Sequence, residues 1–182
     1  MPSPIAHSVT GYALSRLLPL QLPVNSSRRL KLALAIVLAN LPDFDFIGEA
    51  FHIHLHRGFT HSVMFLVGVT LLTSSLAGRI WPTSARQLLL FIPVIYGSHL
   101  FLDCFSIDGP GMKLLWPFSQ DFYGALVGIF SPIDTSKGLF YLGHLRFISL
   151  ELLYGVLVLT PFWIWDKLYR PRLRRAATDS PD

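Results

Sequence analysis

The sequence predicts an all-α protein, a polytopic membrane helical bundle of about four transmembrane helices plus an N-terminal helix. Hydrophobic residues make up 52% of the 182 residues and charged residues only 14%, whereas about 25% of an average soluble protein is charged. The apolar residues also gather in runs that approach the length of a bilayer span. The chain length of 182 residues predicts one membrane-embedded domain, residues 1–170, followed by a basic tail, residues 171–182.

The first half of the chain supplies the N-terminal helix and one short apolar run. Residues 5–20 predict an amphipathic helix that prolines end. Residues 32–41 are apolar, but ten residues rise only about 15 Å, half of what a bilayer core requires. We therefore expect this span to extend in both directions. Two carboxylates, Asp43 and Asp45, stand at its end.

The second half supplies three longer apolar runs. Residues 62–78 carry no charge and form the best transmembrane candidate. Residues 82–87 are expected to be a short polar turn before the next span, residues 88–105. A loop of about 40 residues, 106–147, is too long to be without a role. Residues 148–165 form the last span, which ends in tryptophans typical of a membrane interface.

Positive charge predicts how the spans are oriented. The net charge of +4 comes from the C-terminal segment, whose basic residues are Lys167, Arg170, Arg172, Arg174 and Arg175. Directly after an apolar run, these residues favour a cytoplasmic anchor over a nucleic-acid contact, and we expect no nucleic-acid partner. With this tail inside, every other basic cluster also falls inside, while nearly all the Asp and His residues of interest fall outside. We expect no removable signal peptide.

Residues typical of metal sites gather at that outer face. His99 and Asp103 are four residues apart, so on a helix their side chains share one face about 6 Å apart. Nitrogen and oxygen donors without thiolate suit zinc, manganese or iron in a hydrolytic site. Arg57 is placed to neutralise phosphate charge. The predicted metal-ligating residues are His7, Asp43, Asp45, His56, His61, His99 and Asp103.

Other functions remain open at this point. A single buried His or Asp can simply hydrogen-bond between helices, and Glu151 is interpreted as a helix-capping or cross-helix carboxylate. Ionisable groups in spans also suit an ion- or proton-handling transporter, although the sequence shows no inverted repeat. A non-catalytic metal-binding membrane protein is the third alternative.

Several short motifs carry a family resemblance. In chain order they are Ala6-His7-Ser8, Leu41-Pro42-Asp43-Phe44-Asp45, His56-Arg57-Gly58-Phe59-Thr60-His61-Ser62, His99 with Asp103, and Leu115-Trp116-Pro117-Phe118-Ser119. The set resembles the YdjM-type family of bacterial inner-membrane proteins, described as membrane-bound metal-dependent hydrolases. That family is distantly similar to zinc-dependent phospholipase C and the S1/P1-type nucleases.

The resemblance implies zinc, phosphoester hydrolysis and a bridging role for Asp103. Those enzymes have a further helix with an HxxxHxxxE ligand set, which this sequence lacks. We therefore expect one or two metal ions. The expected function is therefore a membrane-bound metal-dependent hydrolase of the inner (plasma) membrane. It would act on a phosphoester, possibly a lipid, at the outer face through a metal-activated water. Its expected partners are membrane lipids and this substrate, and the sequence indicates no oligomeric state.

Overall fold

The computed structural model describes residues 2–22, 27–45, 57–106, 109, 111–124, 128–130, 141–142 and 144–169. Within these ranges the chain is all-α, with five α-helices and no strand, which confirms the all-α part of the predicted fold class. The α-helices are α1 (Pro4–Leu17), α2 (Ser27–Asn40), α4 (Val63–Gly78), α5 (Pro82–Asp103) and α6 (His144–Ile164). Two 3-10 turns, η1 (Pro42–Asp45) and η2 (Phe59–His61), and a π-helical end, η4 (Trp165–Tyr169), complete the fold.

Three helices begin between one and two turns before the apolar runs that predicted them. The prediction of a polar turn at residues 82–87 is wrong, because α5 begins at Pro82. Proline suits this position, since its fixed φ fits a helix and its missing N–H has no partner in the first turn. In the same way, α2 begins at Ser27 and α6 at His144. Hydrophobicity marks where a helix enters the apolar phase, whereas the backbone becomes helical earlier.

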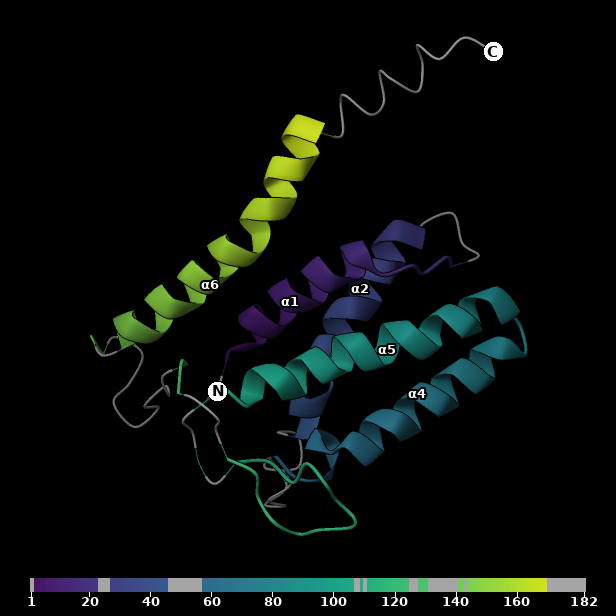
Figure 1. The fold of residues 1–182 in the computed structure, drawn as a ribbon, viewed down its shortest axis with the longest axis horizontal. Coiled ribbons are helices and arrows are strands. Elements are labelled where there is room, and N and C mark those ends of the chain that lie inside the picture. Colours follow the sequence, from purple (N-terminus) through teal and green to yellow (C-terminus); the bar gives the residue numbers. More distant parts are fainter. Residues whose placement is uncertain are drawn as a thin grey trace.

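The helices alternate in direction, so chain segments far apart in sequence meet at the same end of the bundle. Figure 1 shows α1 beside α2 and α4 beside α5, and both pairs are in extensive contact. The start of α1, the end of α2, the start of α4 and the end of α5 lie at one end, which we call the acidic end (Figure 1). A core of small and branched residues holds α2 against α5: Ala35, Leu38, Ala39, Leu88, Phe91, Ile92 and Ile95.

Basic residues gather at the opposite end, which we call the basic end. Arg16 in the last turn of α1 pairs with Asp166 beyond α6, at 2.7 Å between Nη2 and Oδ1. Lys31 in α2 donates to the carbonyl of Leu18 at 2.6 Å. The turn between α4 and α5 adds the exposed Arg79. Arg16, Lys31 and Arg79 thus lie at the end opposite the predicted metal-ligating residues, while the side of the membrane that each end faces stays a prediction.

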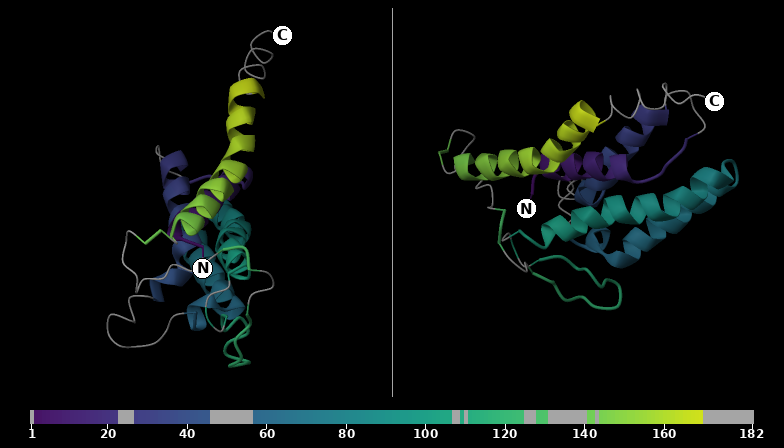
Figure 2. Two further views of the ribbon diagram at one scale, coloured as in Figure 1. Left: turned by 90° about the vertical axis from the view of Figure 1, so that its left-hand side faces the viewer. Right: turned by 45° about the horizontal axis from the view of Figure 1, so that its top comes forward.

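Two of the helices are long and apolar enough to cross a membrane, Pro82–Asp103 and His144–Leu168. The four predicted spans are therefore supported only in part, because α2 has 14 residues and α4 has 16. Only 11% of the apolar window in the second candidate is buried. A core helix of a soluble protein would be mostly buried, so this exposed apolar surface favours contact with lipid. Figure 2 shows α6 standing along one side of the bundle.

Part of the predicted long loop is described, and it closes over the acidic end. Lys113 N donates to the carbonyl of Arg57 at 3.0 Å, and Val63 N donates to the carbonyl of Leu114 at 3.0 Å. The loop also folds back on itself at Gly111, which has a φ of 102° and no side chain, whereas a Cβ there would lie 2.1 Å from the carbonyl oxygen of Tyr123. The loop therefore has a structural role beside the start of α4.

The contact between α1 and α2 depends on Gly11, and this predicts the effect of a substitution. A Cβ at Gly11 would lie 2.8 Å from the Cβ of Ala39 and 2.9 Å from the carbonyl oxygen of Ala35, so it would force the helices apart. We expect Gly11→Ala to destabilise the detergent-solubilised protein by about 1–3 kcal/mol in thermal unfolding. The control is Gly68→Ala, where a Cβ meets nothing within 4 Å. Equal stability of the two variants would contradict the close approach.

Candidate metal centre

The end of α2 delivers two carboxylates to the acidic end. Phe44 N donates to the carbonyl of Leu41 at 3.2 Å, which turns the chain sharply after α2 into the 3-10 turn η1. Asp43 and Asp45 lie in this turn and are both buried. A 3-10 helix has three residues per turn, so side chains two positions apart point in different directions.

The segment before α4 delivers His61. Ser62 caps α4 by accepting a hydrogen bond from Phe65 N at 3.1 Å, and the hydroxyl of Tyr96 on α5 donates to the carbonyl of Thr60. Arg57 has a φ of 57°, a left-handed conformation that turns the chain towards η2. These constraints fix the backbone on both sides of the His61 ring, which is fully buried.

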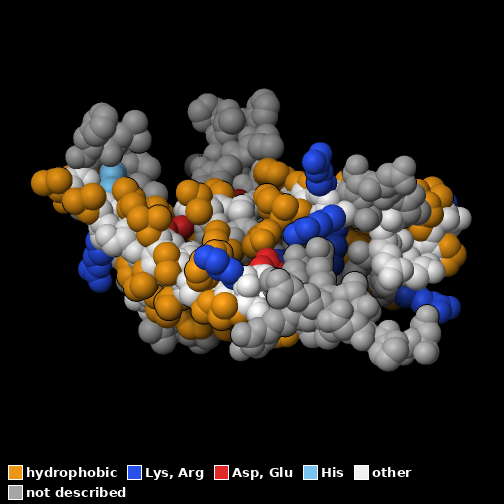
Figure 3. All heavy atoms as spheres, turned by 90° about the horizontal axis from the view of Figure 1, so that it is seen from above, with side chains coloured by type: hydrophobic (Ala, Val, Ile, Leu, Met, Phe, Trp, Pro, Cys, Tyr) orange, Lys and Arg blue, Asp and Glu red, His pale blue; other side chains and the backbone are white. Residues whose placement is uncertain are grey.

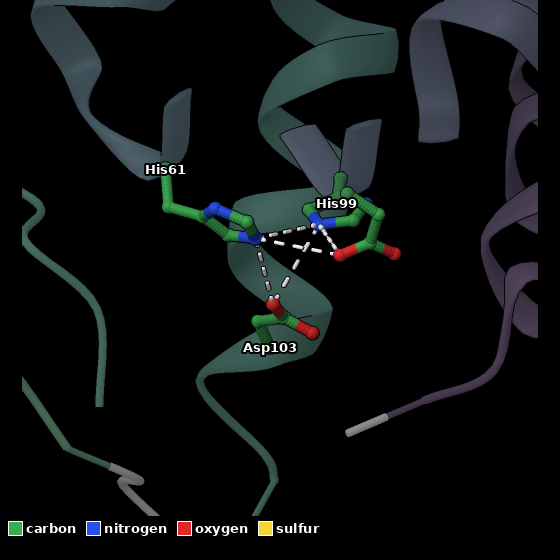
Figure 4. A group of neighbouring side chains, drawn as sticks. His61, His99 and Asp103 are labelled. Carbon is green, nitrogen blue, oxygen red and sulfur yellow. Dashed lines mark hydrogen bonds and ion pairs between the residues drawn. The ribbon is translucent and has the colours of Figure 1, made fainter. Parts of the chain in front are cut away.

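The last two turns of α5 supply His99 and Asp103. They lie four residues apart on one face, as the sequence predicted, with 3.6 Å between Nε2 and Oδ2. Figure 4 shows both side chains facing His61, whose Nε2 is 3.3 Å from that of His99 and 3.5 Å from Asp103 Oδ2. Asp43 completes the set, with its Oδ1 3.5 Å from Nε2 of each imidazole.

The spacing of these four residues fits one metal ion. Asp43, His61, His99 and Asp103 each offer a donor atom, and the four atoms lie within 4.8 Å of one another. Five of the six separations are 3.3–3.6 Å. A tetrahedral zinc site with bonds of about 2.0–2.1 Å has donors about 3.3–3.4 Å apart. We call these four residues the donor cluster.

Hydrogen-bonding groups behind His61 and His99 determine which ring nitrogen carries the proton. The Nδ1 atom of His99 lies 2.8 Å from the carbonyl oxygen of Ala39. Because a carbonyl only accepts, Nδ1 carries the proton and Nε2 presents its lone pair to the donor cluster. Asp45 does the same for His61, with 3.3 Å between Oδ2 and Nδ1. A carboxylate or carbonyl behind a ligating histidine is a common arrangement in metal sites.

Asp45 differs from Asp43 because hydrogen bonds hold its carboxylate in place. Its Oδ2 accepts from Arg57 N at 2.9 Å and from the hydroxyl of Thr60 at 3.0 Å. Both oxygens of Asp43 and both oxygens of Asp103, by contrast, are buried with no hydrogen-bond partner among the described residues. Such atoms are destabilising unless another group compensates them. A cation between the two carboxylates would provide that compensation.

The carboxylates already favour positive charge on His61. Burial on its own would lower the pKa of this imidazole, but the adjacent carboxylates of Asp43, Asp45 and Asp103 raise its pKa to about 9. The field at this point therefore attracts a cation, whether a proton or a metal ion.

His7 joins the donor cluster from α1 and extends it. Its ring stacks on that of His99 at 3.8 Å between centroids, and its Nε2 lies 3.6 Å from Oδ1 of Asp103. Neither ring nitrogen of His7 has a hydrogen-bond partner among the described residues. Asp103 thus presents Oδ2 to the Nε2 atoms of His61 and His99 and Oδ1 to that of His7. The bridging role that the resemblance implies for Asp103 stays a prediction.

The structure brings together five of the predicted metal-ligating residues: His7, Asp43, His61, His99 and Asp103. Asp45 lies behind His61 instead of among the donors, and His56 lies outside the described residues. The Arg57 guanidinium donates to the hydroxyl of Ser106 at 3.3 Å, and its predicted role towards phosphate stays a prediction.

Three further residues have roles that the structure defines. Glu151 accepts from the N–H and the hydroxyl of Ser3 at 2.7 and 2.6 Å, so it is the cross-helix, capping carboxylate that was predicted. The sequence reasoning missed Thr60 and the carbonyl of Ala39. A hydroxyl next to His61 was a usable signal for Thr60, whereas a backbone carbonyl leaves no mark in the sequence.

Comparison with known proteins agrees with the family resemblance. The profile of the family described as YdjM inner membrane protein matches residues 1–171. The chain is 32% identical over 139 residues to inner membrane protein YbcI of Escherichia coli (strain K12), covering 70% of this chain and 80% of that protein. No solved structure matches the chain, so the likeness to phospholipase C and the S1/P1-type nucleases stays a prediction.

The first prediction for the centre concerns metal content. Asp103→Ala removes a donor that faces both His61 and His7, so we expect the purified variant to lose its bound metal to background in elemental analysis. The control is Glu151→Gln, which alters another buried carboxylate that bonds to Ser3. Metal retained by Asp103→Ala, in a protein whose helical content is unchanged, would show that the donor cluster is not the metal site.

The second prediction concerns the support behind His61. Asp45→Asn keeps the shape of the side chain but removes the charge that faces Nδ1. We expect metal affinity to fall by roughly 10–100-fold, as is usual when an outer carboxylate is removed. Competition with a chelator of known affinity measures the change, and Asp121→Asn, at an exposed residue that accepts from Ser119, is the control. Equal affinity of both variants would show that Asp45 does not support the site.

Proposed function

The chain belongs to the YdjM inner membrane protein family, and from that premise we propose that it is a membrane-bound, metal-dependent hydrolase of a phosphoester. The observation that carries the proposal is the buried donor cluster, with its near-tetrahedral spacing and its uncompensated carboxylates. Two imidazole nitrogens with two carboxylate oxygens are the donor chemistry of zinc, and also of manganese or iron.

A divalent ion held there supplies a Lewis acid that polarises a phosphoryl oxygen and makes water more acidic. The protein's own contribution is to orient the donors. Asp45 and the carbonyl of Ala39 hold the imidazoles with Nε2 facing inwards, and Asp103 offers one oxygen to each side. With His7 beyond Asp103, the residues support one ion and leave donors for a second.

Access to the donor cluster favours the side of Asp43. Its side chain is 8% exposed, whereas those of His61, His99 and Asp103 are 0% exposed. A substrate phosphate would therefore approach past Asp43, and the other three residues would stay shielded from water. Removal of water strengthens every electrostatic interaction within the site.

The position of the donor cluster supports a lipid phosphoester as substrate. Asp103 is the last residue of α5, a candidate membrane span. A residue at the end of a span lies near the depth of the lipid headgroups, where phosphoesters are concentrated. With the basic end in the cytoplasm by the positive-inside rule, this site would face the outer side of the membrane.

A second candidate function follows from the same geometry. Four protein donors form a closed set, which is typical of a structural metal site, whereas catalytic zinc sites usually keep one position open. The near-complete burial of the donors favours this alternative of a non-catalytic metal-binding protein. The position of Asp103 between His61 and His7, and the lack of a hydrogen-bond partner for either ring nitrogen of His7 among the described residues, favour the hydrolase, because a purely structural site does not require them.

Reconstitution separates the two functions. We expect protein stripped of metal and reloaded with Zn²⁺ or Mn²⁺ to hydrolyse a chromogenic phosphodiester or a glycerophospholipid, and Asp103→Ala to be inactive. Glu151→Gln is the control and should retain activity. Tight metal binding without hydrolysis of either substrate, with any divalent ion, would overturn the hydrolase and establish the non-catalytic alternative.

A further inference from the structure

We propose that a groove at the basic end of the bundle is a binding site for the headgroup of an anionic phospholipid. The groove lies between α1, α2 and the end of α6 and has a volume of about 680 Å³. It is separate from the donor cluster, because α1 enters the cluster through His7 near its start and lines the groove near its end. Its lining residues are Tyr12, Ser15, Arg16, Leu17, Arg28, Lys31, Leu32, Pro161, Phe162 and Trp165.

The charge of the groove selects an anion. Its lining includes three cationic side chains, those of Arg16, Arg28 and Lys31, and no carboxylate. Asp166 lies beside the groove and pairs with Arg16 at 2.7 Å, so it offsets one of the three charges. Figure 3 shows Lys and Arg side chains on both sides of an acidic side chain, with hydrophobic side chains beside them. Net positive charge at the end of a membrane bundle attracts anionic headgroups.

Lys31 is positioned to bind a phosphate. One of its three N–H groups donates to the carbonyl of Leu18 at 2.6 Å, which leaves two for a ligand among the described residues. A phosphate oxygen beside its ammonium group would form a charge-assisted hydrogen bond.

The walls of the groove suit the rest of a phospholipid. Leu17, Leu32 and Phe162 present apolar surface, and the guanidinium of Arg16 lies over the Phe162 ring at 5.0 Å from its centroid. A free phosphate ion needs neither the apolar walls nor this volume. The glycerol backbone and the first acyl carbons of a lipid would occupy the volume and contact the walls.

The shape of α6 opens the groove towards the bilayer. Pro161 lies inside this helix, where a proline lacks the N–H of the helical ladder and bends the axis. Beyond it the helix widens into the π-helical end Trp165–Tyr169. Figure 1 shows the last turns of α6 leaning away from α1, and residues of both helices line the groove.

Native mass spectrometry of the full-length, detergent-purified protein tests the proposal. We expect phosphatidylglycerol to bind at least tenfold more tightly than phosphatidylcholine. Arg28→Gln combined with Lys31→Gln should weaken phosphatidylglycerol binding about tenfold or more. The matched control is Arg79→Gln with Arg86→Gln, which removes two exposed charges at the same end outside the groove. Arg28→Gln alone, at an exposed residue, provides a variant whose folding is not at risk.

Several outcomes would overturn the proposal. Equal binding of the two lipids, or equal loss in the groove and control variants, would show only general charge attraction. Inorganic phosphate that displaces the lipid at equal concentration would show an anion site without lipid recognition. A dimer that the groove variants abolish would assign the groove to a second copy of the chain. Metal content should stay unchanged in every variant, so failure here is distinguishable from failure of the proposed hydrolase.

Discussion

The burial of two carboxylates without hydrogen-bond partners is the constraint on which the rest of the structure depends. Asp43 and Asp103 come from well-separated parts of the sequence and face the same imidazoles, and their oxygens have no hydrogen-bond partner among the described residues. Buried negative charge is strongly destabilising unless positive charge accompanies it. The two histidines supply part of it, and a divalent cation would supply the remainder. The packing that brings the carboxylates together is therefore coupled to the ion that they hold.

The helical arrangement makes this convergence possible. Because consecutive helices run in opposite directions, the start of α1, the end of α2 and the end of α5 share one end of the bundle (Figure 1). Close approach of the backbones matters as much as direction. Gly11 lets α1 lie against Ala35 and Ala39 of α2, and the carbonyl of Ala39 in turn orients His99. A single small residue thus connects helix packing with the chemistry of the site.

Sequence reasoning predicted what is local or periodic. The pair His99 and Asp103 follows from helical spacing alone, and the apolar runs predicted the helices. It missed the first turns, because a polar turn that precedes an apolar run is helical in backbone but carries no hydrophobic signal. It did not separate Asp43 from Asp45, because that difference arises where η1 meets η2, in contacts with Arg57 and Thr60 that depend on tertiary structure.

Polar contacts along α1 hold α6 to the bundle and connect it with both the donor cluster and the groove. In lipid, apolar helices gain little from association through hydrophobicity, so polar contacts and close packing hold them together. Three polar contacts join α6 and its end to α1: Ser3 with Glu151, Thr10 with Tyr154 at 2.5 Å, and Arg16 with Asp166. They are spaced along the whole of α1, which carries His7 into the donor cluster and Arg16 into the groove. Any movement of α6 relative to α1 would therefore act on both places through one rigid helix.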